Sequence, residues 1–194
     1  DSDTHVTGFG VLRMQPRVFM LVLVAGLVAV SAWPLLTLLP AVAEHLLGLG
    51  KSGYSTLLSS LGVGALGAAL TTATFGSEST RRFLIAGGIS LVSVAVLGLS
   101  LSRDLVPSSV CCAAFGFGMI LFFSTGQAMV QLSTLNHHRG KVMGVWAMML
   151  SGGVPVGNLL VGPAADAWGV TPVLLGQALA VGGVAALLLV RPVP

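Results

Sequence analysis

Charged residues are scarce in this chain of 194 residues. Asp, Glu, Lys and Arg together make up 8% of the sequence, whereas apolar residues make up 55%. A typical globular domain has about 25% charged residues, so this chain has too few charges for a surface that faces water. The 9 basic residues are spread over short segments without interleaved aromatics, and this spread argues against a nucleic-acid partner.

Cysteine is nearly absent, and the two that occur, Cys111 and Cys112, are adjacent. A metal or redox role would need partners at ligand spacing, so we interpret the pair as packing residues and expect no metal site and no cofactor. Ser151-Gly152-Gly153 superficially resembles a nucleophile turn. An intramembrane serine protease would also need a histidine base inside an apolar run, and all 4 histidines lie outside the runs. We therefore predict that the chain is not an enzyme.

The sequence does contain six long runs without a single Asp, Glu, Lys or Arg. About 20 apolar residues cross a hydrocarbon core of ~30 Å as a helix, and the runs lack the alternation of barrel strands. We predict an all-α polytopic membrane protein in a lipid bilayer. Residues 1–17 would form a cytoplasmic flank or linker, and residues 18–194 a six-helix bundle. The expected spans are residues 18–40, 53–75, 83–101, 107–132, 142–165 and 172–190.

The number of basic residues alternates from one flank of the spans to the next. The first, third, fifth and seventh flanks carry 7 of the 9 Lys and Arg residues, and the even flanks carry only Lys51 and Arg103. Short cytoplasmic loops are enriched in Lys and Arg. Both ends of this segment are therefore expected in the cytoplasm.

The spans also suggest an internal duplication at an offset of about 90 residues, which aligns Gly62 with Gly152 and Gly67 with Gly157. Transporters are often built from three-helix repeats, and an odd number of helices inverts the second copy in the membrane. We therefore expect two three-helix inverted repeats.

Small residues form stripes on the second and fifth spans, where Gly64 and Gly67 lie on one span and Gly153 and Gly157 on the other. Such stripes let membrane helices pack closely. They are also compatible with a surface along which helices rock during transport.

Polar residues inside the runs form stripes of their own. In the fourth span Ser124, Gln127 and Gln131 share one helix face. The others are Trp33 and Thr37 in the first span, Ser60 in the second, and Ser151 and Asn158 in the fifth. Lipid cannot satisfy an amide, so these residues either form interhelical hydrogen bonds or contact a substrate. The runs contain no ionisable side chain that could carry a proton.

Three segments carry a resemblance to a known family. The segment from Gln131 to Gly144, with Arg139-Gly140-Lys141-Val142-Met143, resembles the loop between helices 10 and 11 of major facilitator superfamily transporters, with Lys141 in place of a second Arg. Residues 38–54 with 61–67 resemble helices 7 and 8. Residues 162–169 resemble the end of helix 11 and its Asp-x-x-Gly turn, with Asp166 and Gly169. The likeness is to the branch of the enterobactin exporter and related drug-efflux proteins.

The resemblance implies that this chain is the C-terminal half, helices 7–12, of a twelve-helix exporter of small amphiphilic molecules such as a drug or siderophore. Its partners would be the bilayer, a missing N-terminal six-helix half and a small-molecule substrate, and its location the bacterial inner membrane. The mechanism would be alternating access, with helices 7, 8, 10 and 11 lining a central cavity. The alternative is a self-contained six-helix transporter or channel subunit that acts as a homodimer.

The resemblance also implies gating roles for two cytoplasmic loops. Arg139, Gly140 and Lys141 belong to one of them. Glu78, Arg81 and Arg82 belong to the other, which keeps charges but lacks the full Gly-x-x-x-Asp-Arg pattern of the family.

Overall fold

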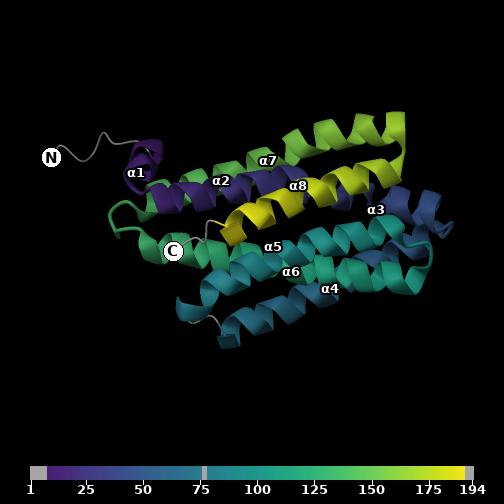
Figure 1. The fold of residues 1–194 in the computed structure, drawn as a ribbon, viewed down its shortest axis with the longest axis horizontal. Helices are drawn as coiled ribbons and strands as arrows, with labels where there is room; N and C mark the ends of the chain where they lie inside the picture. The colour runs from purple at the N-terminus through teal and green to yellow at the C-terminus, as the bar shows by residue number, and fades with distance from the viewer. Residues whose placement is uncertain (1–7, 76–77, 191–194) are drawn as a thin grey trace.

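A computed structural model describes residues 8–75 and 78–190, and the regular structure of these residues is helical (Figure 1). One short element, η2, is a π-helical turn. The elements in chain order are α1 (Gly8–Met14), α2 (Pro16–Ser31), α3 (Leu35–Ala41), η2 (Val42–Leu46), α4 (Gly50–Phe75), α5 (Glu78–Leu101), α6 (Leu105–Ser133), α7 (Arg139–Trp168) and α8 (Val170–Val190).

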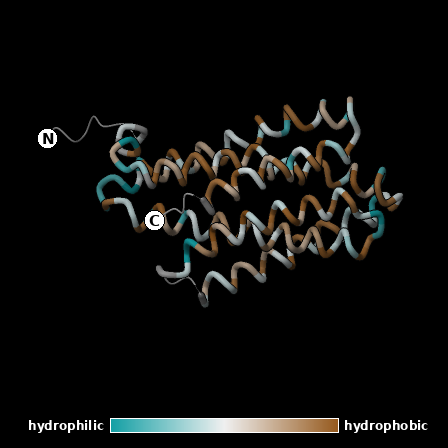
Figure 2. Tube along the Cα trace, viewed as in Figure 1, coloured by the Kyte–Doolittle hydropathy of each residue, from teal (hydrophilic) through white to brown (hydrophobic). Residues whose placement is uncertain are grey.

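Six stretches of the described residues are long and apolar enough to cross a membrane, which confirms the predicted number of spans. In Figure 2 the hydrophilic colours gather mainly at the two ends of the bundle, where the flanks lie. The spans are Val18–Leu46, Gly50–Thr74, Thr80–Leu101, Leu105–Ser133, Arg139–Trp168 and Val170–Leu188.

The first span does not end at Pro40, and that predicted boundary is wrong. Pro40 lies inside α3, and the helix continues through η2 to Leu46. The wider π-helical turn closes when the Leu47 N–H donates to the Val42 carbonyl at 3.2 Å. The chain then reverses through Gly48, which has a φ of +66°, a conformation that glycine adopts without steric cost.

Two prolines, Pro34 and Pro155, affect their helices differently. Pro34 lies between the end of α2 and the start of α3, where the α-helix is interrupted. Pro155 lies inside α7, whose helical structure runs from Arg139 to Trp168. A proline removes one backbone donor and its ring displaces the preceding turn, and Figure 1 shows that α7 bends about midway along its length.

The helices pack in a reciprocal pattern. The first span, α4 and α5 form one triplet, and α6, α7 and α8 form the other. The middle helix of each triplet packs along the first helix of the other, as α4 on α6 and α7 on α2, while α5 packs on α8. The pattern is not fully symmetric, because α5 also packs along α6, whereas α8 touches α2 only slightly.

The bundle has a conventional apolar core and an apolar outer surface. Leu21, Ile89 and Phe122 are fully buried between the helices. Leu66 is 68% exposed and Leu159 is 75% exposed. Large apolar side chains on the outside are expected where the solvent is lipid.

The N-terminal flank contributes to the same body. Residues 8–14 form α1, which contacts α7 and α2, and Leu12 of α1 is fully buried. A methyl group on Gly8 would lie 2.6 Å from the Lys141 carbonyl oxygen. The described part of the segment expected as a linker therefore packs on the bundle.

Candidate functional site

Two of the polar residues singled out in the sequence meet across a helix interface. The Thr37 hydroxyl on α3 donates to the Asn158 Oδ1 on α7 at 2.9 Å. Their sequence positions are 121 residues apart, so the bond joins the first span to the fifth. Thr37 is exposed and Asn158 is half-buried, so the pair lies at the edge of the bundle rather than in its core.

Trp33, four residues before Thr37, joins the first span to α6 through an aromatic cluster. Its ring centroid lies 5.5 Å from that of Phe123 in an edge-to-face arrangement. Phe123 also meets Phe122 at 5.0 Å and Trp146 of α7 at 6.5 Å. Edge-to-face packing is a favourable geometry for aromatic pairs, so the cluster fixes the relative positions of three spans.

Ser124 and Gln127 follow this cluster on α6, and both side chains are exposed. Ser151, two turns before Asn158 on α7, is exposed as well. We call Thr37, Ser124, Gln127, Ser151 and Asn158 the polar set. Its members come from three spans that contact one another, because α6 and α7 touch and α3 packs on α7.

The other two polar candidates lie elsewhere. Ser60 on α4 is half-buried, and its hydroxyl donates to the Thr56 carbonyl one turn earlier at 2.8 Å. Gln131 is half-buried near the end of α6, where its backbone carbonyl accepts from the Arg139 Nε at 3.1 Å. This second contact ties the start of α7 to the end of α6.

The loop residues expected to act in gating lie at one end of the bundle, and their environments differ. Arg82 is exposed and its guanidinium carbon lies 4.7 Å from the centroid of the Phe83 ring. Arg81 and Lys141 are half-buried, and Gly140 is exposed. The Glu78 side chain lies outside the described residues.

Asp166 and Gly169 lie at the opposite end of α7. Asp166 is exposed. Gly169 has a φ of +86°, and its N–H donates to the Ala165 carbonyl at 2.9 Å, which ends the helix. A positive φ favours glycine here.

The four small residues expected to pack helices lie at helix crossings. A methyl group on Gly64 would overlap the Ala113 carbonyl of α6, and one on Gly157 would overlap the Val30 carbonyl of α2. A methyl group on Gly153 would lie 3.0 Å from the Ala29 Cβ. Gly67 is looser, with the nearest Phe117 atom at 3.4 Å.

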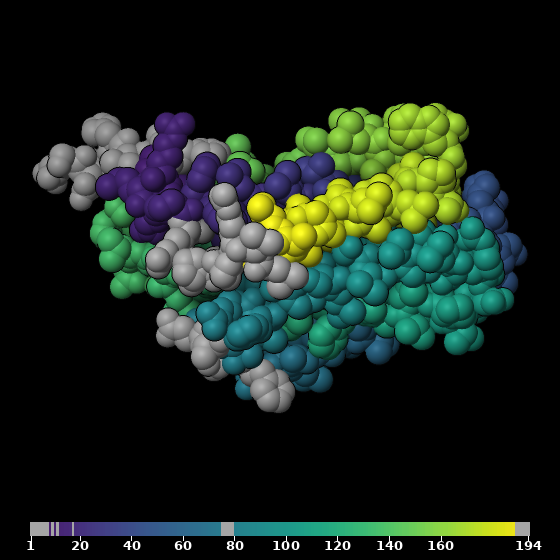
Figure 3. All heavy atoms as spheres, in the orientation of Figure 1, coloured from purple at the N-terminus to yellow at the C-terminus, as the bar shows by residue number. Residues whose placement is uncertain are grey.

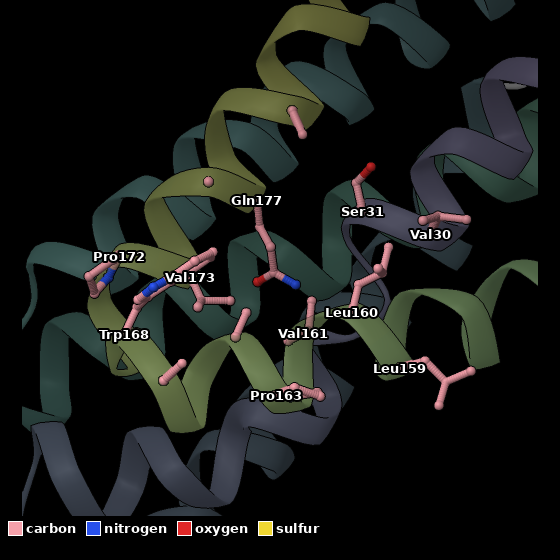
Figure 4. Close-up of a pocket in the computed structure, with 14 residues that line it drawn as sticks. Val30, Ser31, Leu159, Leu160, Val161, Pro163, Trp168, Pro172, Val173 and Gln177 are labelled. Carbon is pink, nitrogen blue, oxygen red and sulfur yellow. The ribbon is translucent and has the colours of Figure 1, made fainter.

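The structure adds a pocket that the sequence did not indicate. It has a volume of about 700 Å³ and lies between the far half of α7, the first half of α8 and the end of α2 (Figure 4). Gln177 of α8 lines it and is only 5% exposed. The signal was present, because Gln177 is the one polar side chain between residues 172 and 190. It was missed because it belongs to no stripe.

Together these observations define a class of protein: an integral, all-α membrane protein with polar residues at the edge of the bundle on three neighbouring spans. No group of three or more His, Cys, Asp or Glu side chains in the described residues is placed to hold a metal ion. The sequence matches the transmembrane secretion effector family over residues 6–194, and the chain therefore belongs to this family of the major facilitator superfamily.

The curated relatives agree with this membership. The chain is 26% identical over 165 residues to a protein named macrolide efflux protein A of Streptococcus pyogenes, and equally to that of S. pyogenes serotype M6. The match covers 84% of this chain but only 41% of each relative. The chain thus spans about two fifths of the length of the curated relatives it matches.

Proposed function

We propose that this chain is the C-terminal six-helix half of an efflux transporter for small amphiphilic molecules. The observation that carries the proposal is the exposure of four of the five members of the polar set, Asn158 being half-buried, on membrane spans. An unpaired amide in hydrocarbon costs several kcal/mol, so lipid is an unsuitable neighbour for Gln127. A partner half and a water-filled path between the halves would supply what lipid cannot.

The family and the relatives support the direction of transport. The family's description is that of a secretion effector, and the relatives' names are those of efflux proteins. A drug-like amphiphile is therefore a better proposed substrate than a siderophore. The location proposed is the bacterial inner membrane, with both ends of this segment in the cytoplasm.

Within this proposal the half supplies walls and polar contacts rather than the coupling charge. Its apolar runs contain no Asp, Glu, Lys or Arg. Alternating access would move this bundle against its partner half, and the proton-carrying carboxylate would lie in that partner. Neutralising Glu44, Glu78, Asp104 or Asp166 should then leave proton coupling intact, and loss of coupling with retained substrate binding would contradict this assignment.

The transport test uses the full-length protein in bacterial cells that accumulate a radiolabelled macrolide. Cells that express the wild type should accumulate less label than vector controls, and Gln127→Leu should raise accumulation toward the control level. The matched variant is Leu132→Ala, exposed on the same helix but rotated by about 140°. Equal accumulation in wild-type and vector cells would overturn the proposal for this substrate class.

Reconstitution distinguishes the homodimer alternative, in which a second copy of the chain covers the polar set. The number of polypeptides in the particle that transports substrate into proteoliposomes decides between the two. One full-length polypeptide per particle supports the half-transporter, whereas two copies of this six-helix segment alone would favour the homodimer.

Orientation is tested by cysteine labelling in a background in which Cys111 and Cys112 are replaced by Ala. Asp104→Cys and Asn136→Cys place exposed thiols at opposite ends of the bundle. A membrane-impermeant thiol reagent should label the first in intact cells and the second only after lysis. The reverse result would place both ends of this segment outside.

A further inference from the structure

The pocket beside α8 is built from side chains that leave room for a ligand. Gly176 and Ala180 of α8, one turn apart, line the pocket together with Gln177 and provide almost no bulk. Ala164 and Ala167 of α7 do the same on the opposite wall. The surface is hollowed here, with α2 recessed between the far half of α7 and α8 (Figure 3). A volume of about 700 Å³ lies within the range of sites that hold drug-sized molecules.

Gln177 is the unexplained group of this pocket. Its side chain points from α8 toward Val161 of α7 (Figure 4), and neither its Nε2 nor its Oε1 has a hydrogen-bond partner. A buried amide without partners costs free energy that a leucine at the same position would not. The Ser31 hydroxyl, which also lines the pocket, donates to the Leu27 carbonyl at 2.7 Å.

The chemistry of the lining selects the kind of molecule that fits. None of the lining residues is charged, and most are apolar. A charged ligand would therefore lose its hydration without a counter-ion. A free amide offers both donors and an acceptor, so its best partner is a group that also donates and accepts.

We propose that this pocket is a binding site for an uncharged amphiphile, whose apolar body lies between α7 and α8 and whose single amide or hydroxyl group pairs with Gln177. The pocket includes no member of the polar set, so it is a separate site. The proposal concerns binding alone and is independent of whether the protein exports anything.

The test uses the full-length protein in nanodiscs and a long-chain primary amide that carries a photoactivatable diazirine in its chain. After irradiation, mass spectrometry locates the labelled residues. Labelling should saturate with probe concentration and concentrate on residues 159–168 and 172–180. Labelling that rises linearly and covers all outer helix faces would show partition into lipid only and would overturn the proposal.

Two matched pairs sharpen the result. Gly176→Phe should fill the pocket and abolish the concentrated labelling, whereas Gly183→Phe, two turns further along α8 and equally open, should not. Gln177→Leu should weaken apparent affinity for the amide about tenfold and leave a diazirine hydrocarbon without the amide unaffected. Unchanged affinity of both variants for the amide would overturn the assignment.

Competition separates the two possible sources of the ligand. Unlabelled diacylglycerol represents a membrane lipid with a free hydroxyl, and unlabelled decanamide represents a small amphiphile from solution. Competition by either one supports the site and identifies the source, whereas competition by neither would contradict its preference for uncharged amphiphiles.

Discussion

The two helix seams α4–α6 and α2–α7, in which the middle helix of one triplet packs on the first helix of the other, are close-packed in different ways. Across α4–α6 both helices supply a glycine: a methyl group on Gly64 would overlap the Ala113 carbonyl, and one on Gly116 would overlap the Leu61 carbonyl. Across α2–α7 the tight glycines belong to α7, whereas Gly26 of α2 has its nearest neighbour, the Met149 sulfur, at 3.4 Å.

This difference has a structural consequence. The reciprocal seam holds two unbroken helices together at their crossing. The one-sided seam ends near Gly157. Opposite this residue, the helix of the first span is already interrupted at Pro34. Beyond that point α7 leaves α2, and the pocket beside α8 lies there. The tight glycines thus mark where each pair of helices crosses closely, and the bend of α7 lies near its Pro155.

The largest expected effect comes from breaking the reciprocal seam. Gly64→Leu should destabilise the bundle by about 3 kcal/mol or more, because the new side chain meets backbone that cannot rotate away. Gly62→Leu is the control, since a Cβ there meets nothing within 4 Å. Thermal unfolding in detergent gives the melting temperature of both variants. Similar melting temperatures would contradict the conclusion that the α4–α6 seam is tightly packed at Gly64.

The one-sided seam should respond less. Gly157→Ala is expected to cost about 1–3 kcal/mol, because the break at Pro34 lets α2 yield. Gly152→Ala, whose Cβ faces open space, should be neutral. The comparison is with Gly64→Ala in the same assay. An equal loss of stability in Gly64→Ala and Gly157→Ala would show that the interruption at Pro34 does not help α2 to move.

A smaller effect is expected at the hydrogen bond that joins the divergent region to the first span. Thr37→Val keeps the shape but removes the hydroxyl that donates to Asn158, and side-chain hydrogen bonds between membrane helices contribute about 0.6 kcal/mol on average. Thr37→Ser should retain most of that stability. Equilibrium unfolding in mixed micelles distinguishes them, and a stable Thr37→Val protein would mean that the bond is energetically neutral.

The smallest effect is predicted for Gly67→Ala, at the position that the internal repeat aligns with Gly157. Its Cβ would lie 3.4 Å from Phe117, an ordinary contact with a side chain that can move. We expect a change within about 0.5 kcal/mol. A melting temperature lowered as much as in Gly157→Ala would show that the aligned positions are equally tight, contrary to the asymmetry of the seams.

The number and type of the spans were predictable because they depend on local composition. A long run without charge is recognisable from its composition alone. The internal repeat that the glycines suggested stays a prediction. The boundary at Pro40 was not predictable by the same means, because a proline favours a helix end and the π-helical turn that follows has no signature of its own.

The candidate site was predictable only residue by residue. Helix periodicity placed Ser124 and Gln127 on one face, but the contact between Thr37 and Asn158 depends on how two helices rotate against each other. Gln177 was overlooked for a related reason, since a lone amide in an apolar run gives no periodic signal. Gln177 becomes a candidate only because it lines a pocket, and that pocket depends on the bend of α7 and on the small residues opposite, which are features of the tertiary structure.

The spans also differ in length, and this sets a relation to bilayer thickness. Helix α7 has 30 residues and α8 has 21, which at 1.5 Å per residue correspond to about 45 Å and about 32 Å. The long helix can tilt or protrude to suit the membrane, but the short one just matches a hydrocarbon core of ~30 Å. In a bilayer with longer acyl chains, α8 would be the first of the spans to become shorter than the hydrocarbon core. The face of the bundle that carries the pocket is therefore also the face most sensitive to the composition of its membrane.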